Sequence, residues 1–368
     1  MTVERQDAPA AALDTLYARL DEAALRPLWT ITEQLLTPEP RPKAVPWLWP
    51  AETMRPLAEE AIRLVPVERG GERRVLSLAN PGLGGRPYAV GTLWGALQAL
   101  GPRESAPAHR HSPGAIRFVL EGEGVWTTVD GDACDMGPGD LILTPGWAWH
   151  DHTNAGDAPM FWFDGLDLPM IEALDGVFFE PYPDDRQPVD GPHNASERGG
   201  PAGPRFAEGR VTDALDPRPS PLLAYRWADT DAELSRLAAA SDDGVVSLEF
   251  TNPVNGASVL PTLSCGMHRV VPGRATLPVR RTGNTIYVVY QGEGHSVMGG
   301  RRFDWRAGDM FVAPSWVPVE HHADTQADLF SLGDAPVLRA LGVYREETLA
   351  APQDVTSTFQ PKNGKNPR

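Results

Sequence analysis

The first part of the chain places its apolar residues at helical spacing. Between about residues 10 and 36 they recur every three or four positions, as Leu13, Leu16, Tyr17, Leu20, Leu28, Ile31 and Leu35. This spacing predicts an amphipathic helix, and Pro27 predicts a break or kink within it. A second short helix is expected over about 53–64, after the Pro-rich run at 46–50. The pattern therefore predicts an N-terminal helical segment over residues 1–66.

From about residue 73 the pattern changes to short runs rich in β-branched and aromatic residues. Glycine, proline, aspartate and asparagine separate these runs, which read RRVLSLAN, YAVGTLW, IRFVLEG, GVWTTVD, DLILTP and MFWFDG. Many short strands with frequent turns are typical of a β-sandwich or barrel. The 36 glycines and 37 prolines agree with that expectation. We therefore expect a fold dominated by β-structure.

The second half of the chain repeats the first at an offset of roughly 170 residues. RFVLEGEG at 117–124 corresponds to YVVYQGEG at 287–294, and GPGDLILTPGW at 137–147 corresponds to RAGDMFVAPSW at 306–316. A period this long indicates a duplicated domain rather than a solenoid.

Between the two copies lies a polar segment without periodicity, PYPDDRQPVDGPHNASERGGPAGPR. Such a composition is typical of a linker. We therefore expect a first barrel over 67–180, a linker over 181–225 and a second barrel over 226–350, with a short helix over 231–240. Residues 351–368 are expected to form a tail, the last dozen or so positions being disordered.

Charge and cysteine content exclude several classes of protein. The chain has 49 acidic and 33 basic residues, for a formal net charge of −16, so nucleic acid and anionic membranes are poor partners. A small anionic ligand would need a local cationic pocket. We find no signal peptide and no apolar run long enough to cross a bilayer. Cys134 and Cys265 lie in no motif, which fits a reducing cytoplasm.

Four of the nine histidines form two pairs, His109 with His111 and His150 with His152. On a β-strand, residues two apart point to the same face, so each pair aims two imidazoles at one spot. A single histidine of this kind is usually an ordinary surface or core residue. Two such pairs in one barrel instead favour a metal site. Spacing alone does not choose between His150 and His152 as a ligand.

The residues around these histidines resemble the two cupin motifs. The resemblance is carried by His109-x-His111 with the following Gly-Glu-Gly, by Gly139 and Pro145, and by His150 and Asn154, with Trp147 at the usual glycine position. The duplicated arrangement resembles a bicupin, which has two double-stranded β-helix (jelly-roll) barrels. More closely, 107–131 and 139–154 are similar to the gentisate 1,2-dioxygenase family, which includes salicylate and 1-hydroxy-2-naphthoate dioxygenases. The likeness covers most of residues 45–345.

This resemblance implies a ligand set. The cupin pattern makes His150 the third ligand beside His109 and His111, and it leaves His152 in the cavity as a group that exchanges a proton. Ala115 stands where many cupins have a fourth, glutamate ligand. Three facial imidazoles leave positions open for substrate and O2. A three-histidine site also suits Zn²⁺, but the resemblance implies Fe(II), one per chain.

Arg117 begins a predicted strand in phase with His109 and His111. An inward-facing arginine is costly unless it meets an anion, so we expect it to bind a substrate carboxylate. The alternative is an ion pair with Asp140 or Asp164. The family likeness favours the first interpretation.

Further candidate substrate-binding residues lie nearby. Trp94, Ala96 and Gln98 alternate on one predicted strand, so Trp94 would shape a flat pocket, Ala96 would set its room and Gln98 would offer an amide. Ordinary core packing is an equal possibility for Trp94. Asp164 is a candidate contact to a ring hydroxyl, with a strand-end turn as the alternative. Arg73 and Arg74 are weaker candidates for additional positive charge, with a slight preference for Arg73, because an arginine there more often makes a surface pair.

The second barrel departs from the first at the ligand positions. Val279 stands in place of His109, Arg281 in place of His111 and Val319 in place of His150. We therefore expect no equivalent metal site and interpret this barrel as structural, with His321 and His322 lacking partners.

Together these features predict a cytoplasmic Fe(II)-dependent dioxygenase. The resemblance implies that it opens gentisate (2,5-dihydroxybenzoate) with O2 to give maleylpyruvate, and that it assembles as a homotetramer. Three alternatives remain: the same chemistry on salicylate or 1-hydroxy-2-naphthoate, a non-oxidative isomerase or decarboxylase using Zn²⁺ or Mn²⁺, and a ligand-sensing bicupin. The last would call for a DNA-binding segment, which the acidic charge disfavours.

Overall fold

The structure is a computed structural model that describes residues 10–66, 74–200, 203–211, 218–274 and 276–361. It divides into two compact units, residues 1–41 and 42–368. The first unit contains helix α1 (Ala10–Glu22), a 3-10 turn (Leu28–Thr30) and helix α2 (Thr32–Leu35). The predicted break is present but comes earlier than Pro27, because α1 already ends at Glu22 and Ala24 has a positive φ of 53°.

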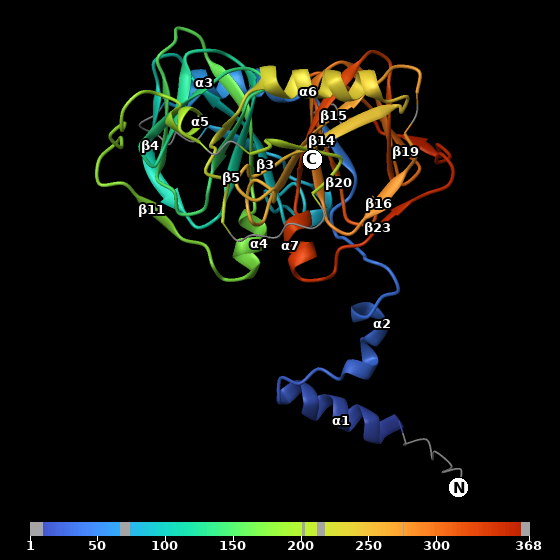
Figure 1. The fold of residues 1–368 in the computed structure, drawn as a ribbon. Helices are drawn as coiled ribbons and strands as arrows, with labels where there is room; N and C mark the ends of the chain where they lie inside the picture. Colours follow the sequence, from blue (N-terminus) through green and yellow to red (C-terminus); the bar gives the residue numbers. More distant parts are fainter. Residues whose placement is uncertain (1–9, 67–73, 201–202, 212–217, 275, 362–368) are drawn as a thin grey trace. The chain divides into compact units, whose positions relative to one another are not determined.

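The second unit contains two β barrels, each made of two sheets (Figure 1). The first barrel has sheet order β13-β8-β5-β10-β3-β2 packed on β11-β4-β9-β6-β7. Its strands are β2 (Val75–Ser77), β3 (Trp94–Leu100), β4 (Ser105–His111), β5 (Ala115–Glu121), β6 (Val125–Val129), β7 (Asp132–Met136), β8 (Leu141–Thr144), β9 (His150–Asn154), β10 (Met160–Leu166), β11 (Phe179–Pro181) and β13 (Ala224–Tyr225).

The second barrel repeats this plan with sheet order β1-β20-β17-β22-β15-β14-β12 and β23-β16-β21-β18-β19-β24. Its strands are β1 (Trp47–Trp49), β12 (Phe206–Glu208), β14 (Val245–Phe250), β15 (Ser264–Val270), β16 (Val279–Arg281), β17 (Thr285–Gln291), β18 (Glu293–Met298), β19 (Arg301–Arg306), β20 (Met310–Ala313), β21 (Val319–Ala323), β22 (Ala327–Gly333), β23 (Glu346–Thr348) and β24 (Ser357–Thr358). The predicted bicupin fold is confirmed.

The largest apolar core lies between the barrels rather than inside either one. Phe118 of β5 stacks on Phe330 of β22 with ring centroids 4.3 Å apart. Gly165 in β10 allows this close approach, because a Cβ there would lie 2.4 Å from a methyl carbon of Leu332. Burial of this shared surface favours one folding unit over two independent barrels.

Residues 47–64 bind to both barrels, although this stretch was predicted as turn and helix. Trp47–Trp49 forms β1 and pairs antiparallel with β20 of the second barrel. Helix α3 (Ala51–Leu64) follows at once and contacts β2 and β3 of the first barrel. The predicted helix over 53–64 is therefore present and begins at Ala51. No helix in the described residues is long and apolar enough to cross a membrane.

The segment predicted as a linker, 181–225, adds structure to both barrels. β11 at its start pairs with β4, β12 pairs with β14, and β13 at its end pairs with β8. A short helix, α5 (Ala195–Arg198), lies between β11 and β12. Helix α6 (Trp227–Ala240) follows the segment and includes the predicted helix over 231–240.

The predicted tail is ordered up to residue 361. β24 pairs in parallel with β19, and the side chain of Phe359 is buried against Trp47 and Phe303. The expectation of a disordered end is therefore wrong for residues 357–361, because an aromatic residue anchors them to the second barrel. Residues 362–368 lie outside the described residues.

A reciprocal pair of contacts joins the barrels near two short helices, α4 (Leu168–Ala173) and α7 (Ala335–Ala340) (Figure 1). Asp167, just before α4, accepts a hydrogen bond from the Thr262 hydroxyl of the second barrel at 2.5 Å. Asp334, just before α7, accepts one from the Thr92 hydroxyl of the first barrel. The two copies of the sequence repeat thus make corresponding hydrogen bonds to each other.

Candidate active site

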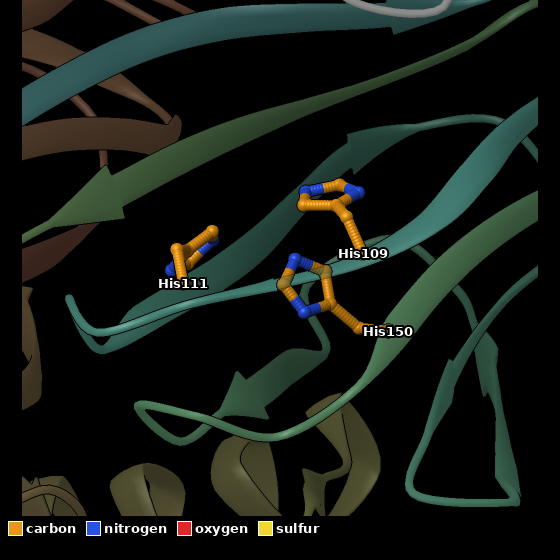
Figure 2. Close-up of side chains that lie close together, drawn as sticks. All are labelled: His109, His111 and His150. Carbon is orange, nitrogen blue, oxygen red and sulfur yellow. The ribbon is translucent and has the colours of Figure 1, made fainter. Parts of the chain in front are cut away.

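Three of the four predicted histidines meet on one wall of the first barrel (Figure 2). His109 and His111 lie on β4, and His150 lies on neighbouring β9, directly across from His109. The ring centroid of His150 lies 4.3 Å from that of His109 and 4.8 Å from that of His111. One nitrogen of each ring lies within 4.8 Å of those of the other two. The three imidazoles therefore converge on one point.

The hydrogen bonds of these rings fit a metal. Each Nδ1 faces a backbone carbonyl oxygen: His109 that of Pro107 at 2.9 Å, His111 that of Pro113 at 2.7 Å and His150 that of Ala148 at 3.0 Å. A nitrogen facing a carbonyl carries the proton, so Nε2 is the unprotonated nitrogen of each ring. The Nε2 of His150 is buried without a hydrogen-bond partner among the described residues.

Burial favours the uncharged form of two of these imidazoles, those of His111 and His150. It lowers the pKa of His111 to about 4 and that of His150 well below its usual value. Nearby Arg117 lowers both pKa values further. Neutral imidazoles are the form that binds metal, so this environment favours a divalent cation held by the three histidines.

His152 lies in the same cavity but apart from the three-nitrogen group. Its ring centroid is 6.1 Å from that of His150. Its Nδ1 lies 2.8 Å from the hydroxyl of Thr127, whose oxygen is also 3.1 Å from the sulfur of Met136. Burial and Arg117 lower the pKa of His152 well below its usual value. The structure thus separates His150 from His152, which the sequence spacing did not.

A cavity of about 420 Å³ opens beside the histidines, within the usual size range for small-molecule sites. Of the predicted substrate residues, Trp94, Gln98, Arg117 and Asp164 line it. Ala96 shares their face but is fully buried and lies outside the lining. Arg73 lies outside the described residues.

Arg117 is buried in this cavity with incomplete pairing. One of its terminal nitrogens donates a hydrogen bond to Thr144, and within the described part of the chain its Nε has no hydrogen-bond partner. The alternative ion pair with Asp164 is present, with Oδ1 of Asp164 3.9 Å from that Nε, although this distance is too long for a hydrogen bond. Burial lowers the pKa of Arg117 and raises that of Asp164. The guanidinium therefore retains capacity for an incoming anion.

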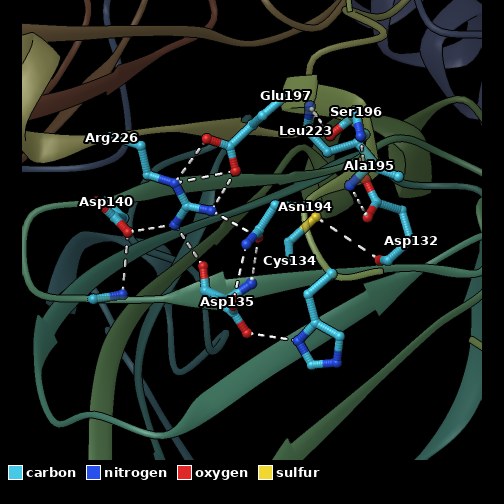
Figure 3. A network of polar contacts seen from close by, with 12 residues as sticks. Asp132, Cys134, Asp135, Asp140, Asn194, Ala195, Ser196, Glu197, Leu223 and Arg226 are labelled. Carbon is cyan, nitrogen blue, oxygen red and sulfur yellow. Dashed lines mark hydrogen bonds and ion pairs between the residues drawn. The ribbon is translucent and has the colours of Figure 1, made fainter. Parts of the chain in front are cut away.

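Asp140, the other alternative partner of Arg117, is engaged elsewhere. It accepts hydrogen bonds from Arg226, which also bonds Glu197 and Asn194 (Figure 3). This network fixes the segment before α6 on the first barrel. The expected alternative of an Arg117–Asp140 ion pair is therefore wrong.

Phe179 is a lining residue that sequence reasoning missed. It lies on β11, opposite His111, and its ring stacks on His109 with centroids 5.1 Å apart and planes 30° apart. With Trp94 it gives the cavity two aromatic walls. The run FFEP offered only a weak β-signal, and the pairing of β11 with β4 joins residues that are far apart in sequence.

Comparison with known proteins agrees with this geometry. A model of the cupin domain matches residues 96–166. A gentisate 1,2-dioxygenase from Streptomyces sp is 48% identical over 90% of this chain and 94% of its own length. A 5-aminosalicylate 1,2-dioxygenase from Comamonas sp is 36% identical over 94% of each chain.

A solved structure shares the whole fold. Salicylate 1,2-dioxygenase from Pseudoaminobacter salicylatoxidans, determined as an adduct with gentisate, superposes with a TM-score of 0.86 and 41% identity. The match covers 95% of this chain and 98% of that one. The chain therefore belongs to the bicupin family of ring-cleaving dioxygenases that includes gentisate 1,2-dioxygenase.

Proposed function

We propose that this protein opens the ring of gentisate with O2, between the carboxylate-bearing carbon and the adjacent hydroxyl-bearing carbon, to give maleylpyruvate. The observation that carries the proposal is the convergence of three imidazoles beside an incompletely paired arginine in one cavity. Gentisate is both the named substrate of the Streptomyces relative and the molecule bound in the solved structure. The activity belongs to the catabolism of aromatic acids.

We assign His109, His111 and His150 as the ligands of one Fe(II) per chain. When bound, iron would supply Lewis acidity and one-electron chemistry, which the ring and O2 need in order to react. The ligand type also suits Zn²⁺. The dioxygenase relatives favour iron, because Zn²⁺ has no redox chemistry.

Arg117 and Gln98 orient the substrate in this proposal. The guanidinium meets the carboxylate through a charge-assisted hydrogen bond, and the Gln98 amide donates a second. Trp94 and Phe179 hold the ring between apolar surfaces. Fixing the ring in one orientation lowers the entropy cost of reaction.

His152 is the proposed proton acceptor. Its Nδ1 can donate to the Thr127 hydroxyl, because the Met136 sulfur gives that hydroxyl an acceptor of its own. Nε2 is then unprotonated and can take the proton of the substrate hydroxyl next to the carboxylate. The lowered pKa of His152 keeps it neutral before substrate binds.

Asp164, Ala96 and Arg73 have smaller proposed roles. Asp164 lines the cavity beside Arg117 and would contact the far ring hydroxyl. Ala96 would limit the room behind the ring. Arg73 remains a weak candidate for additional positive charge.

Related aromatic acids are the main alternative substrates. Relatives of this chain are named for 5-aminosalicylate and 1-hydroxy-2-naphthoate, and the solved structure for salicylate. Turnover of gentisate, salicylate and 1-hydroxy-2-naphthoate should therefore be measured side by side. We expect gentisate to have the highest kcat/KM.

The deciding experiment is anaerobic reconstitution with Fe(II), addition of gentisate and then admission of air. We expect O2 uptake in equal amount to gentisate, with a change in the ultraviolet spectrum as the ring opens. A protein without O2 uptake on any of the three acids would contradict the proposal. Turnover without O2 would instead favour an isomerase or decarboxylase.

We further propose a cytoplasmic homotetramer. Cys134 and Cys265 are both buried and free, as expected for a reducing compartment. Light scattering coupled to size-exclusion chromatography measures the assembly, and a mass other than four chains would contradict this part.

A further inference from the structure

The second barrel keeps a cavity at the place that corresponds to the active site. Val279 on β16 pairs directly with Val319 on β21, as His109 pairs with His150 in the first barrel. Likewise Arg281 lies opposite Glu346 of β23, as His111 lies opposite Phe179 of β11. The cavity measures about 770 Å³. The second barrel therefore keeps an open cavity although it lacks the three histidines.

The lining of this cavity is cationic. It includes three guanidinium groups, those of Arg210, Arg281 and Arg339. Nε of Arg281 lies 3.4 Å and Nη1 of Arg210 lies 3.5 Å from the same carboxylate oxygen of Glu346. One carboxylate of the lining thus serves two arginines, and buried Glu249, outside the lining, also interacts with Arg210 and Arg339. The other acidic group of the lining, Asp243, is an exposed residue.

Hydrogen bonds satisfy these arginines only in part, and Nη1 of Arg210 donates one to the hydroxyl of Tyr344 at 3.2 Å. Nε of Arg281 is buried and has no hydrogen-bond partner among the described residues. The guanidinium of Arg339 lies over the ring of Tyr344, 4.6 Å from its centroid. A buried donor without an acceptor costs free energy unless a ligand supplies one. The same type of orphaned Nε marks Arg117 in the first barrel.

The remaining polar groups of the cavity are neutral. His268 bonds the hydroxyls of Ser247 and Ser331, and His321 bonds that of Ser296. Val245, Leu277, Val279, Val319 and the ring of Tyr287 supply apolar surface. Positive charge beside apolar walls fits an organic anion better than a bare inorganic one.

We propose that the second barrel binds a small organic carboxylate without a metal, with Arg210, Arg281 and Arg339 supplying the positive charge. Arg281 stands at the position that corresponds to His111. It would attract the anion, as a metal ion would in the first barrel. The proposal concerns the second barrel alone and does not depend on the reaction in the first. The same chemistry could come from an aromatic acid or from a ring-opened dicarboxylate.

Calorimetric titration of the full chain tests this binding. Arg117→Gln serves as the background, because it weakens carboxylate binding in the first barrel. The two probes are gentisate and maleylpyruvate, which distinguish an aromatic source from a ring-opened one. We expect one site per chain for at least one probe, weakened at least about tenfold by Arg281→Gln and further by Arg281→Gln/Arg339→Gln. Arg281→Lys, which keeps the charge, should retain part of the affinity.

Arg236→Gln is the matched control, since Arg236 lies on the exposed surface of α6 and pairs with Glu233. It should leave binding unchanged. Binding of neither probe, or binding that survives the Arg281→Gln/Arg339→Gln change, overturns the proposal. Should the double variant fold poorly, crystals of the unaltered chain soaked with 5-iodosalicylate give an independent readout. An anomalous iodine peak in the second barrel supports the proposal, and a peak confined to the first barrel overturns it.

Discussion

The two barrels share a scaffold but differ in the chemistry of their cavities. Both place a strand pair at the same register, His109 with His150 in one and Val279 with Val319 in the other. Both make the same turn, with Trp147 and Trp316 at positive φ values of 67° and 66°. The difference teaches that the fold supplies the cavity, while a few side chains decide what it binds.

The backbone around the first site explains why so few side chains suffice. Two of the carbonyl oxygens that orient the three histidines, those of Pro113 and Ala148, lie in turns, and that of Pro107 lies within β4 where its pairing with β9 is irregular. Such outer hydrogen bonds fix the tautomer of a ligand. The chemistry of a barrel therefore depends on the side chains that its strands present.

The largest expected effect comes from removing one ligand. His150→Ala should remove most of the bound iron and lower turnover by more than about 100-fold, since partners that only orient a ligand already contribute 10–100-fold. Iron content by atomic absorption and O2 uptake measure this. Val319→Ala, at the corresponding position, should change neither. Equal iron loss in both variants, or in His321→Ala, would show that the ligand assignment is wrong.

His152 and His321 are the corresponding histidines that both barrels retain. His152→Asn should lower kcat by about 100-fold through loss of the proton acceptor, with iron content unchanged. His321→Asn should leave kcat as it is. Steady-state O2 uptake together with metal analysis separates the two roles, and iron loss from His152→Asn would make His152 a ligand instead.

Arg117 corresponds to Tyr287 in the second barrel. Arg117→Gln should lower kcat/KM by about 10–150-fold, mainly through KM, because a hydrogen bond to a charged group contributes about 1.5–3 kcal/mol. Tyr287→Phe should leave both constants unchanged. An unchanged KM in Arg117→Gln would argue that the carboxylate binds elsewhere.

The difference between the barrels can also be tested by giving the second barrel the three histidines of the first. Val279→His, Arg281→His and Val319→His together restore the ligand pattern at matching register. The triple variant should bind two metal ions per chain instead of one, measured by metal analysis after dialysis. The double variant that keeps Arg281 should bind one, because two ligands beside a guanidinium hold a cation weakly. A folded triple variant that still binds one ion would show that the scaffold also differs.

Sequence reasoning found the elements that carry strong local patterns. Alternating runs predicted the main strands, and the repeat predicted the duplication. It missed β1 and the short strand β24, because segments of two or three residues have no period of their own. Their places depend on sheet edges formed by residues far away in the chain.

In the site, too, local spacing predicted some features and only the fold determined the others. Spacing put His150 and His152 on one face, and only the sheet register and ring positions separate them. The cationic cavity of the second barrel was not predicted, because Arg210, Arg281 and Arg339 come from three separate elements. The second barrel was predicted to be structural because it lacks histidine at the three ligand positions.

The contacts that the barrels exchange should make the stability of the protein depend on pH. Burial raises the pKa of Asp167 from 3.8 to about 6. The folded protein thus holds this proton more tightly than the unfolded chain. Its contribution to stability is complete below about pH 4 and is lost as pH rises through 6, at a cost of about 3 kcal/mol. Asp167→Asn should remove this loss, because the Thr262 hydroxyl can accept from the new amide.

Asp334 should behave differently although it corresponds to Asp167. Its carboxylate accepts from Thr92 and from both the backbone and the side chain of Asn284. An asparagine there would set one amide nitrogen against another, so Asp334→Asn should destabilise the protein at every pH. Urea unfolding of both variants between pH 4 and 8 measures the difference. Asp334→Asn could instead become more stable than the unaltered protein as the pH rises, as expected for Asp167→Asn. The Asp334–Thr92 and Asp167–Thr262 contacts would then be equivalent in energy as well as in geometry.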